Sequence, residues 1–115
     1  AELTASSDVQ SLVADGKSTA KLEVTLFSAN NPVGGNVWVD IEAPEGVTEK
    51  DYQFLPSKND HFVSGKITRT FSTSKPGVYT FTFNALTYGG YEMKPVTVTI
   101  TAVDADTAKG EEAMK

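Results

Sequence analysis

Three runs of alternating apolar and polar residues constrain the fold of this chain more than any other feature. They are Ala20-Lys21-Leu22-Glu23-Val24-Thr25-Leu26, Val37-Trp38-Val39-Asp40-Ile41 and Val96-Thr97-Val98-Thr99-Ile100. Residues two apart on a strand share a face, so each run has one apolar face and one polar face. An apolar face of this kind needs a second sheet to cover it, and the pattern therefore predicts two packed sheets.

Turn signals divide the rest of the chain into further short strands. We expect an edge segment over 2–13, a strand over 62–71 with a bulge near Gly65, and an aromatic strand over 78–85. A last strand is expected over about 92–103, and a short edge strand inside the loop 45–60. The sequence thus predicts an all-β chain: an immunoglobulin-like antiparallel Greek-key β-sandwich of about seven strands.

The composition changes character after residue 103. Residues 1–103 are rich in β-forming residues and are expected to be one immunoglobulin-like β-sandwich, whereas 104–115 are mostly Ala, Asp, Glu, Lys and Gly. We interpret 104–115 as a linker or disordered tail. Because the chain starts at Ala1 without Met or a leader sequence, we expect a mature fragment or a piece of a longer protein.

Charge and composition argue against two classes of partner. The net charge is −5 and the ten Lys and Arg residues are scattered, so no basic surface for nucleic acid is expected. No apolar stretch approaches the roughly 20 residues that span a bilayer, so direct membrane insertion is not expected either. With no cysteine, the chain has neither a disulfide nor a thiolate metal site.

Three turn motifs, in order, resemble those of one family. Val13-Ala14-Asp15-Gly16-Lys17-Ser18-Thr19-Ala20 precedes the first alternating run, Asn31-Pro32-Val33-Gly34-Gly35 precedes the second, and Pro76-Gly77-Val78-Tyr79-Thr80-Phe81-Thr82 opens the aromatic strand. Together they resemble the bacterial immunoglobulin-like repeats of the invasin and intimin adhesins over about residues 10–103. The loop before Asn31 lacks the family's Asp-x-x-Gly, and the insertion 44–61 is longer and more charged than a minimal repeat needs.

The resemblance implies a non-enzymatic module of a bacterial cell-surface adhesin or a secreted virulence-type protein. Such a module acts as a rigid spacer and is a candidate protein-protein interaction domain. The implied partners are adjacent domains of a longer chain and a host or bacterial surface protein, at an extracellular or bacterial cell-surface location. Two alternatives stay open: a structural or decoration domain of a bacteriophage virion, and an accessory carbohydrate-binding module of an enzyme.

No catalytic residues are predicted. His61 is the only histidine and no serine lies in a nucleophile-elbow context, so we interpret His61 as a half-exposed surface residue. Carboxylates gather at Asp40, Glu42, Glu45, Glu49 and Asp51. The first two fall on the polar face of one strand and the others in a loop, which predicts solvated charges rather than an acid–base pair.

No cofactor is predicted. Asp104 and Asp106 form an Asp-x-Asp pair just after the last strand. Calcium prefers several oxygen ligands, and a junction between domains can assemble them from both sides. The pair is therefore a candidate calcium-binding linker, with Glu111 and Glu112 as distant ligands. The alternative is an ordinary solvated linker.

Three aromatic residues are candidates for binding. Trp38 shares its parity with polar residues and is expected to point outward, unless the insertion covers it or a bulge turns it inward. Tyr88 and Tyr91 flank Gly89-Gly90 at an expected hairpin tip, where exposed rings could contact a partner. Tyr79 is interpreted as a tyrosine corner, with its hydroxyl bonded to nearby backbone.

Overall fold

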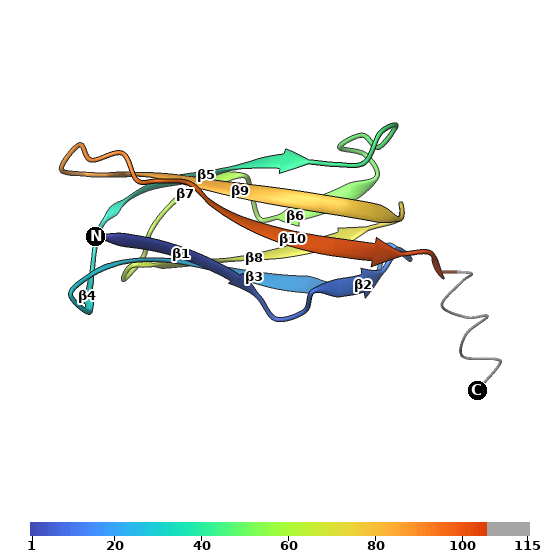
Figure 1. The fold of residues 1–115 in the computed structure, drawn as a ribbon, viewed down its shortest axis with the longest axis horizontal. Coiled ribbons are helices and arrows are strands. Elements are labelled where there is room, and N and C mark those ends of the chain that lie inside the picture. The colour runs from blue at the N-terminus through green and yellow to red at the C-terminus, as the bar shows by residue number, and fades with distance from the viewer. Residues whose placement is uncertain (106–115) are drawn as a thin grey trace.

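The computed structural model describes residues 1–105, which form two sheets packed face to face (Figure 1). In chain order the described strands are β1 (Glu2–Ser7), β2 (Ser11–Val13), β3 (Ala20–Ser28), β4 (Asn31–Pro32), β5 (Gly35–Glu42), β6 (Tyr52–Leu55), β7 (Asn59–His61), β8 (Lys66–Thr73), β9 (Gly77–Thr87) and β10 (Val96–Val103). The first sheet has the order β1-β3-β8-β6, with β4 beside β3, and the second has the order β2-β10-β9-β5-β7. The predicted immunoglobulin-like sandwich is confirmed, with ten strands in the described part where about seven were expected.

The core lies between the sheets, where the apolar faces of the alternating strands meet. Leu22, Val24 and Leu26 of β3 are fully buried, while the residues between them are at least partly exposed. From the opposite sheet, the ring of Phe81 lies 4.8 Å, centroid to centroid, from that of Phe71 in an edge-to-face contact. Such aromatic pairs add to the stabilisation that burial of their area provides.

The first edge segment divides into β1 and β2 because its apolar positions change parity. Leu3 and Ala5 point inward from β1, whereas Leu12 points inward from β2. At the change, the N–H of Asp8 donates to the carbonyl of Lys21 (3.0 Å) and a carboxylate oxygen of Asp8 accepts the N–H of Lys21 (2.7 Å). The chain then leaves β3 and pairs in parallel with the end of β10. A shift of one residue exchanges the two faces of a strand. One regular strand over residues 2–13 therefore could not bury Leu3 and Ala5 together with Leu12.

The prediction of a bulged strand over 62–71 is wrong. The chain instead makes a tight turn at Ser64 and Gly65, whose φ values are 53° and 73°. Val63 and Lys66 exchange two backbone hydrogen bonds of 3.1 Å across this turn. Two successive residues with positive φ give a hairpin turn that reverses the chain, which explains the opposite parities of the residues before and after it. A side chain at Gly65 would also place its Cβ 2.8 Å from the carbonyl oxygen of Leu26.

The last strand is shorter than predicted. β10 begins at Val96 rather than near residue 92, although the N–H of Met93 still donates to the carbonyl of Ala85 (2.8 Å). Pro95 immediately precedes β10 and has no N–H for a sheet ladder. β10 ends at Val103. The predicted linker or tail lies outside the described residues from residue 106 on, so the division at residue 103 stays a prediction.

The tyrosine corner is confirmed. The hydroxyl of Tyr79 donates to the carbonyl of Lys75 (2.7 Å) and lies 2.7 Å from the hydroxyl of Thr73. Burial raises the pKa of the Tyr79 phenol above its ordinary value. Because Tyr79 is in β9 and Thr73 is in β8, their contact connects the two sheets near one end of the sandwich.

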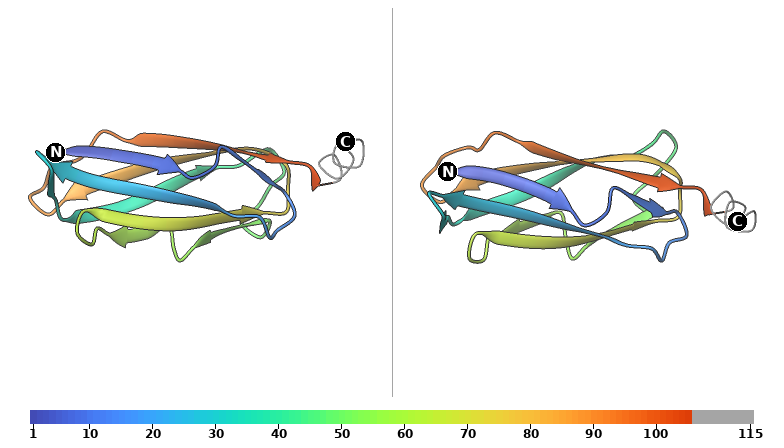
Figure 2. Two further views of the ribbon diagram at one scale, coloured as in Figure 1. Left: turned by 90° about the horizontal axis from the view of Figure 1, so that it is seen from below. Right: turned by 60° about the horizontal axis from the view of Figure 1, so that its bottom comes forward.

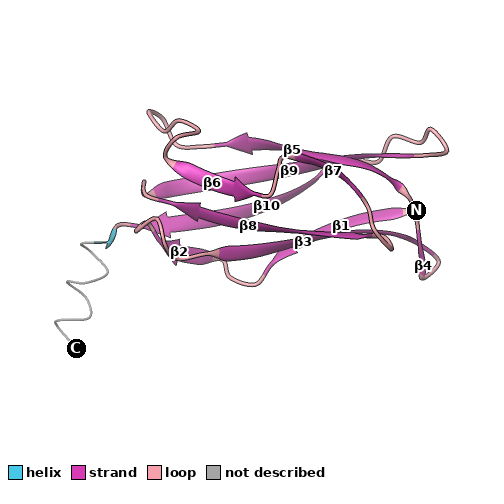
Figure 3. Cartoon of the chain, turned by 180° about the vertical axis from the view of Figure 1, so that it is seen from behind, coloured by secondary structure: helices cyan, strands magenta, loops and turns pink. Residues whose placement is uncertain are grey.

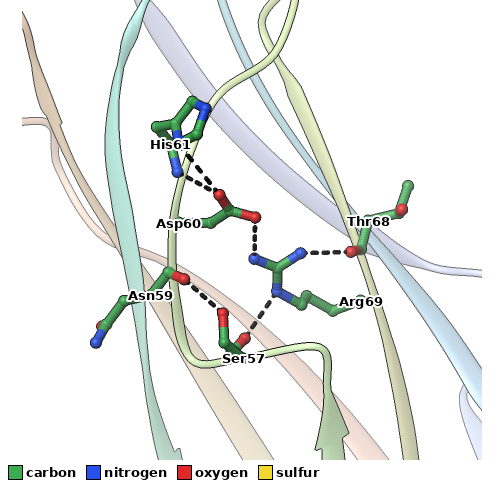
Figure 4. A network of polar contacts seen from close by, with 6 residues as sticks. All are labelled: Ser57, Asn59, Asp60, His61, Thr68 and Arg69. Atoms are coloured by element: carbon green, nitrogen blue, oxygen red, sulfur yellow. Dashed lines mark hydrogen bonds and ion pairs between the residues drawn. The ribbon is translucent and has the colours of Figure 1, made fainter.

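The insertion 44–61 crosses from one sheet to the other. It contains the expected short edge strand, β6, which pairs with β8, and then β7, which was not expected and pairs with β5 (Figure 3). Arg69 of β8 points inward below this crossover and is only 4% exposed. Its guanidinium donates to the carbonyls of Ser57 (2.8 Å) and Thr68 (2.7 Å) and to the carboxylate of Asp60 (2.5 Å), as Figure 4 shows. These bonds fasten the crossover to β8.

Candidate interaction surface

The N-terminal tip of the sandwich is formed by three segments. The chain start, β4 and the β9–β10 loop all lie at one end in Figure 1, and the C-terminal end of β10 lies at the other. The β9–β10 loop is closed by hydrogen bonds of 2.9 Å between Thr87 and Tyr91, one from the Thr87 N–H to the Tyr91 carbonyl and one from the Tyr91 N–H to the Thr87 hydroxyl. Gly90 has φ 92°, which glycine adopts at little cost. The tip therefore has a defined conformation.

Tyr88 is anchored at its backbone and exposed at its ring. Its N–H donates to the carbonyl of Gly34 (3.1 Å), and its ring lies directly over Gly34. A Cβ added at Gly34 would lie 2.9 Å from a ring carbon of Tyr88, so a larger residue there would displace the ring. The Tyr88 residue is nevertheless 66% exposed. An aromatic ring held in one place and open to solvent is suited to contact a partner.

Trp38 points outward, as its parity predicted. It is half-buried, whereas its neighbours Val37 and Val39 are buried on the core side of β5. Across the sheet it lies opposite Asn84 of β9 and Asn59 of β7. No bulge turns it into the core, because β5 pairs with β9 in one uninterrupted register from Gly35 to Glu42.

Trp38 and Tyr88 share one face of the second sheet, and Leu86 lies between them. Leu86 is two residues beyond Asn84, on the same face, and is 37% exposed. At about 3.3 Å per residue, the register places Trp38 and Tyr88 roughly 13 Å apart along the strands. We name Trp38, Leu86 and Tyr88 the aromatic stripe. Sequence reasoning missed Leu86, although the period-2 pattern of β9 continues through it to Tyr88.

Tyr91 is exposed but belongs to a different surface. The residue is 73% exposed and lines an open cleft of about 580 Å³ at the tip. Ala1, Val33 and Met93 are among the other residues that line this cleft. The structure thus brings two of the three predicted binding residues, Trp38 and Tyr88, onto one face and leaves Tyr91 beside the chain start.

His61, Asp40 and Glu42, which the sequence singles out as titratable residues, are exposed on the surface. The His61 side chain is 61% exposed, with its Nδ1 3.4 Å from a carboxylate oxygen of Asp60. Asp40 and Glu42 are exposed on the outer face of β5, and a carboxylate oxygen of Asp40 accepts a hydrogen bond from the amide of Asn84 (3.1 Å). Asp60 differs from these, because its hydrogen bond from Arg69 lowers the pKa of its carboxyl below the ordinary range.

Of the predicted calcium-linker residues, only Asp104 lies among the described residues. Asp104 follows directly after β10, at the end of the sandwich opposite the tip, and Asp106 lies outside the described residues, as do Glu111 and Glu112. Among the described residues, no group of three or more His, Cys, Asp or Glu side chains is placed to hold a metal ion. The described part of the chain also contains no helix with the length and apolarity to cross a membrane.

Comparison with known proteins identifies the fold. No protein-family model matches the chain, and no curated protein sequence matches it. Solved structures do match: the D0-D1 domain of intimin has a TM-score of 0.65 at 19% identity, covering 88% of this chain and 48% of that one. Invasin, a bacterial integrin-binding protein, has a TM-score of 0.59 at 17% identity, covering 90% of this chain and 19% of that one.

A third match comes from an enzyme. A glycosyl hydrolase family 2 member from Bacteroides cellulosilyticus has a TM-score of 0.66 at 16% identity, covering 89% of this chain and 14% of that one. The chain therefore spans less than half of each of these structures. The chain has an immunoglobulin-like β-sandwich fold. More particularly, it has the fold of the intimin and invasin immunoglobulin-like domains, in agreement with the turn motifs of the sequence.

Proposed function

We propose that this chain is a non-enzymatic immunoglobulin-like module of a bacterial surface adhesin, which spaces neighbouring domains and contacts a protein partner through the aromatic stripe. The observation that carries the spacer role is the placement of the chain start and the end of β10 at opposite ends of the sandwich (Figure 1). Domains joined at these two points would be separated by the full length of the sandwich. The fold shared with intimin and invasin supports the same role.

The contact role rests on the aromatic stripe. Tyr88 and Leu86 are exposed beside the half-buried Trp38, on a face otherwise lined with polar side chains such as Asn84 and Asp40. Aromatic residues with apolar neighbours and a polar rim are typical of protein contact sites. A carbohydrate-binding module would present Trp38 and a tyrosine as exposed coplanar rings. The partial burial of Trp38 therefore favours a protein partner over a glycan.

Bead adhesion tests the contact role. Beads coated with the chain are applied to cultured host cells and to bacterial cells, with Tyr88→Ser as the stripe variant and Val78→Ser as the control. Val78 is also exposed and apolar, at 53%, but lies at the opposite end of β9. We expect the wild type and Val78→Ser to adhere and Tyr88→Ser to lose most adhesion. Equal adhesion of all three proteins would contradict the contact role.

The spacer role is tested with a reference binding domain of known target, fused before Ala1. We expect the fusion to reach its target from a brush-coated surface better than the same domain on a flexible linker of equal residue number. No difference between the two fusions would contradict the spacer role. Specific retention on a glycan array, lost in Trp38→Ala, would instead support the carbohydrate-binding alternative.

A further inference from the structure

The first half of β10 has an unpaired edge. β2 pairs in parallel with β10 only from Thr101 to Val103, and β9 occupies the other side of the strand. The N–H of Thr101 donates to the carbonyl of Gln10 (3.0 Å), so the backbone of Thr101 faces away from β9. Residues two apart on a strand direct their N–H and C=O groups to the same side. The backbone groups of Thr97 and Thr99 therefore also face away from β9, where none of the described strands pairs with them.

The opposite wall of this opening is also a strand edge that is unpaired within residues 1–105. β1 runs beside the first half of β10 in the other sheet (Figures 1 and 2). Asp8 bonds to Lys21 of β3, so the even-numbered residues of this segment face β3, and the backbone of Ala5 and Ser7 faces the opening. We name the space between β1 and the first half of β10 the lateral seam. Two rows of backbone donors and acceptors face one another across it.

The lateral seam is a groove without charge. It has a volume of about 450 Å³, and all nine residues that line it are uncharged, in a chain where 22% of residues are charged. Its walls combine the apolar side chains of Ala5, Val9 and Val98 with hydroxyl groups, among them those of Ser7 and Thr99. Exposed strand edges are usually protected by charged side chains, proline or a covering segment. No lining residue of the seam is charged or a proline.

The length of the unpaired edge limits what can bind. Five residues, 96–100, lie between Pro95, which has no N–H, and the first residue that pairs with β2. At about 3.3 Å per residue this edge is roughly 17 Å long, which suits one short extended segment. Val96 and Val98 point toward the core side but are only half-buried, so there is room beside them for small apolar side chains.

We propose that the lateral seam is a strand-addition site, which binds an extended, uncharged peptide segment of about five residues with small apolar side chains at alternate positions. The segment pairs with the backbone of Thr97 and Thr99 and continues the ladder that β2 forms with the end of β10. Main-chain hydrogen bonds supply the recognition of an extended backbone, and the groove selects small side chains on the face that points inward. This site is separate from the aromatic stripe.

Two substitutions of Thr99 distinguish the contribution of its backbone N–H to peptide binding from that of its side chain. Thr99→Pro removes the N–H that faces the seam, and it leaves the ladder with β9 intact because that N–H does not face β9. Thr99→Ala keeps the N–H and removes only the side chain. Thermal unfolding establishes that both variants are folded before binding is measured.

The probe is the synthetic peptide acetyl-Ser-Val-Ser-Val-Ser-amide, titrated to millimolar concentration into isotope-labelled protein and followed by amide NMR shifts and hydrogen exchange. We expect the largest shifts at Thr97 and Thr99, at least tenfold slower exchange of these two amides, and at least tenfold weaker binding to Thr99→Pro than to Thr99→Ala. The absence of shifts in the wild type would overturn the proposal. So would shifts centred on Tyr88, or equal binding by the two variants.

A second copy of the chain is the competing occupant. Without peptide, we expect Thr97 and Thr99 to exchange fast at every protein concentration, while Thr101 is protected by its bond to Gln10. Protection of Thr97 and Thr99 that grows with protein concentration, together with dimers in sedimentation, would show that the seam pairs with itself. That result would overturn the peptide assignment.

Discussion

On one lateral side of the sandwich the chain crosses between the sheets from β6 to β7, and on the other side it crosses from β1 to β2 but leaves the first half of β10 without a partner among the described strands. The crossover from β6 to β7 is fastened by Arg69, whose guanidinium bonds to Ser57, Thr68 and Asp60 (Figure 4). The lateral seam has no such fastening among the described residues, and its walls are uncharged. An inward-pointing arginine thus holds the crossover on one side, whereas the uncharged edge on the other side is the proposed strand-addition site.

Among the substitutions that compare the two sides, we expect removal of the Arg69 guanidinium to have the largest effect on stability. Arg69→Met keeps most of the buried aliphatic chain but leaves the carboxylate of Asp60 and the carbonyls of Ser57 and Thr68 without their donor. We expect a loss of about 3 kcal/mol in the free energy of unfolding, measured by urea denaturation. Lys66→Met, on the exposed side of the same strand, is the control and should change stability by less than about 0.5 kcal/mol. If Arg69→Met loses no more stability than the control, the hydrogen bonds of Arg69 do not stabilise the crossover from β6 to β7.

The tyrosine corner is the second polar connection between the sheets. Tyr79→Phe leaves the ring in the core but removes the hydroxyl that contacts Thr73 and Lys75. We expect about 1–2 kcal/mol less stability in urea, because buried polar groups lose a partner, and unchanged adhesion in the bead assay. Stability equal to wild type would contradict the structural role of this hydroxyl.

The side held by Arg69 should also respond to acid. The hydrogen bond from Arg69 lowers the pKa of Asp60 in the folded state, so the unfolded state takes up a proton first as the pH falls. The contribution of Asp60 to stability is therefore complete above its unfolded pKa, about 3.9, and is lost as the pH falls through the lower, folded value. We expect unfolding curves at pH 7, 4 and 2.5 to show a smaller acid-induced loss in Asp60→Asn than in wild type. Parallel losses in the two proteins would show that other carboxylates dominate.

We expect substitution in the lateral seam to have the smallest effect on stability. Thr99→Ala removes an exposed side chain whose neighbour across the ladder is Thr80, and we expect stability to change by about 0.5 kcal/mol or less. The same urea measurement checks it. A loss comparable to that of Arg69→Met would mean that the seam is a structural element of the sandwich, not a spare edge.

Features that depend on residues close together in the sequence were predicted better than features that depend on residues far apart in it. The inward faces of β3 and β9, the outward position of Trp38 and the bond from Tyr79 to nearby backbone follow from local alternation and turn chemistry. The turn at Ser64 and Gly65 was misread as a bulge, because both features change parity within a few residues. Arg69 was not singled out, since an arginine at an inward position becomes intelligible only when Asp60 and Ser57 lie beside it.

The same division holds for the candidate sites. Tyr88 and Trp38 could be named from the sequence, since an aromatic residue at an outward position is visible in the alternation itself. The sequence by itself determined the two-sheet architecture, because period-2 alternation fixes which side of each strand must be covered. Only the tertiary structure decided that Leu86 joins Trp38 to Tyr88, that Arg69 holds the crossover on one side, and that half of β10 stays unpaired. These depend on strand order and register, which are set by contacts between residues far apart in the chain.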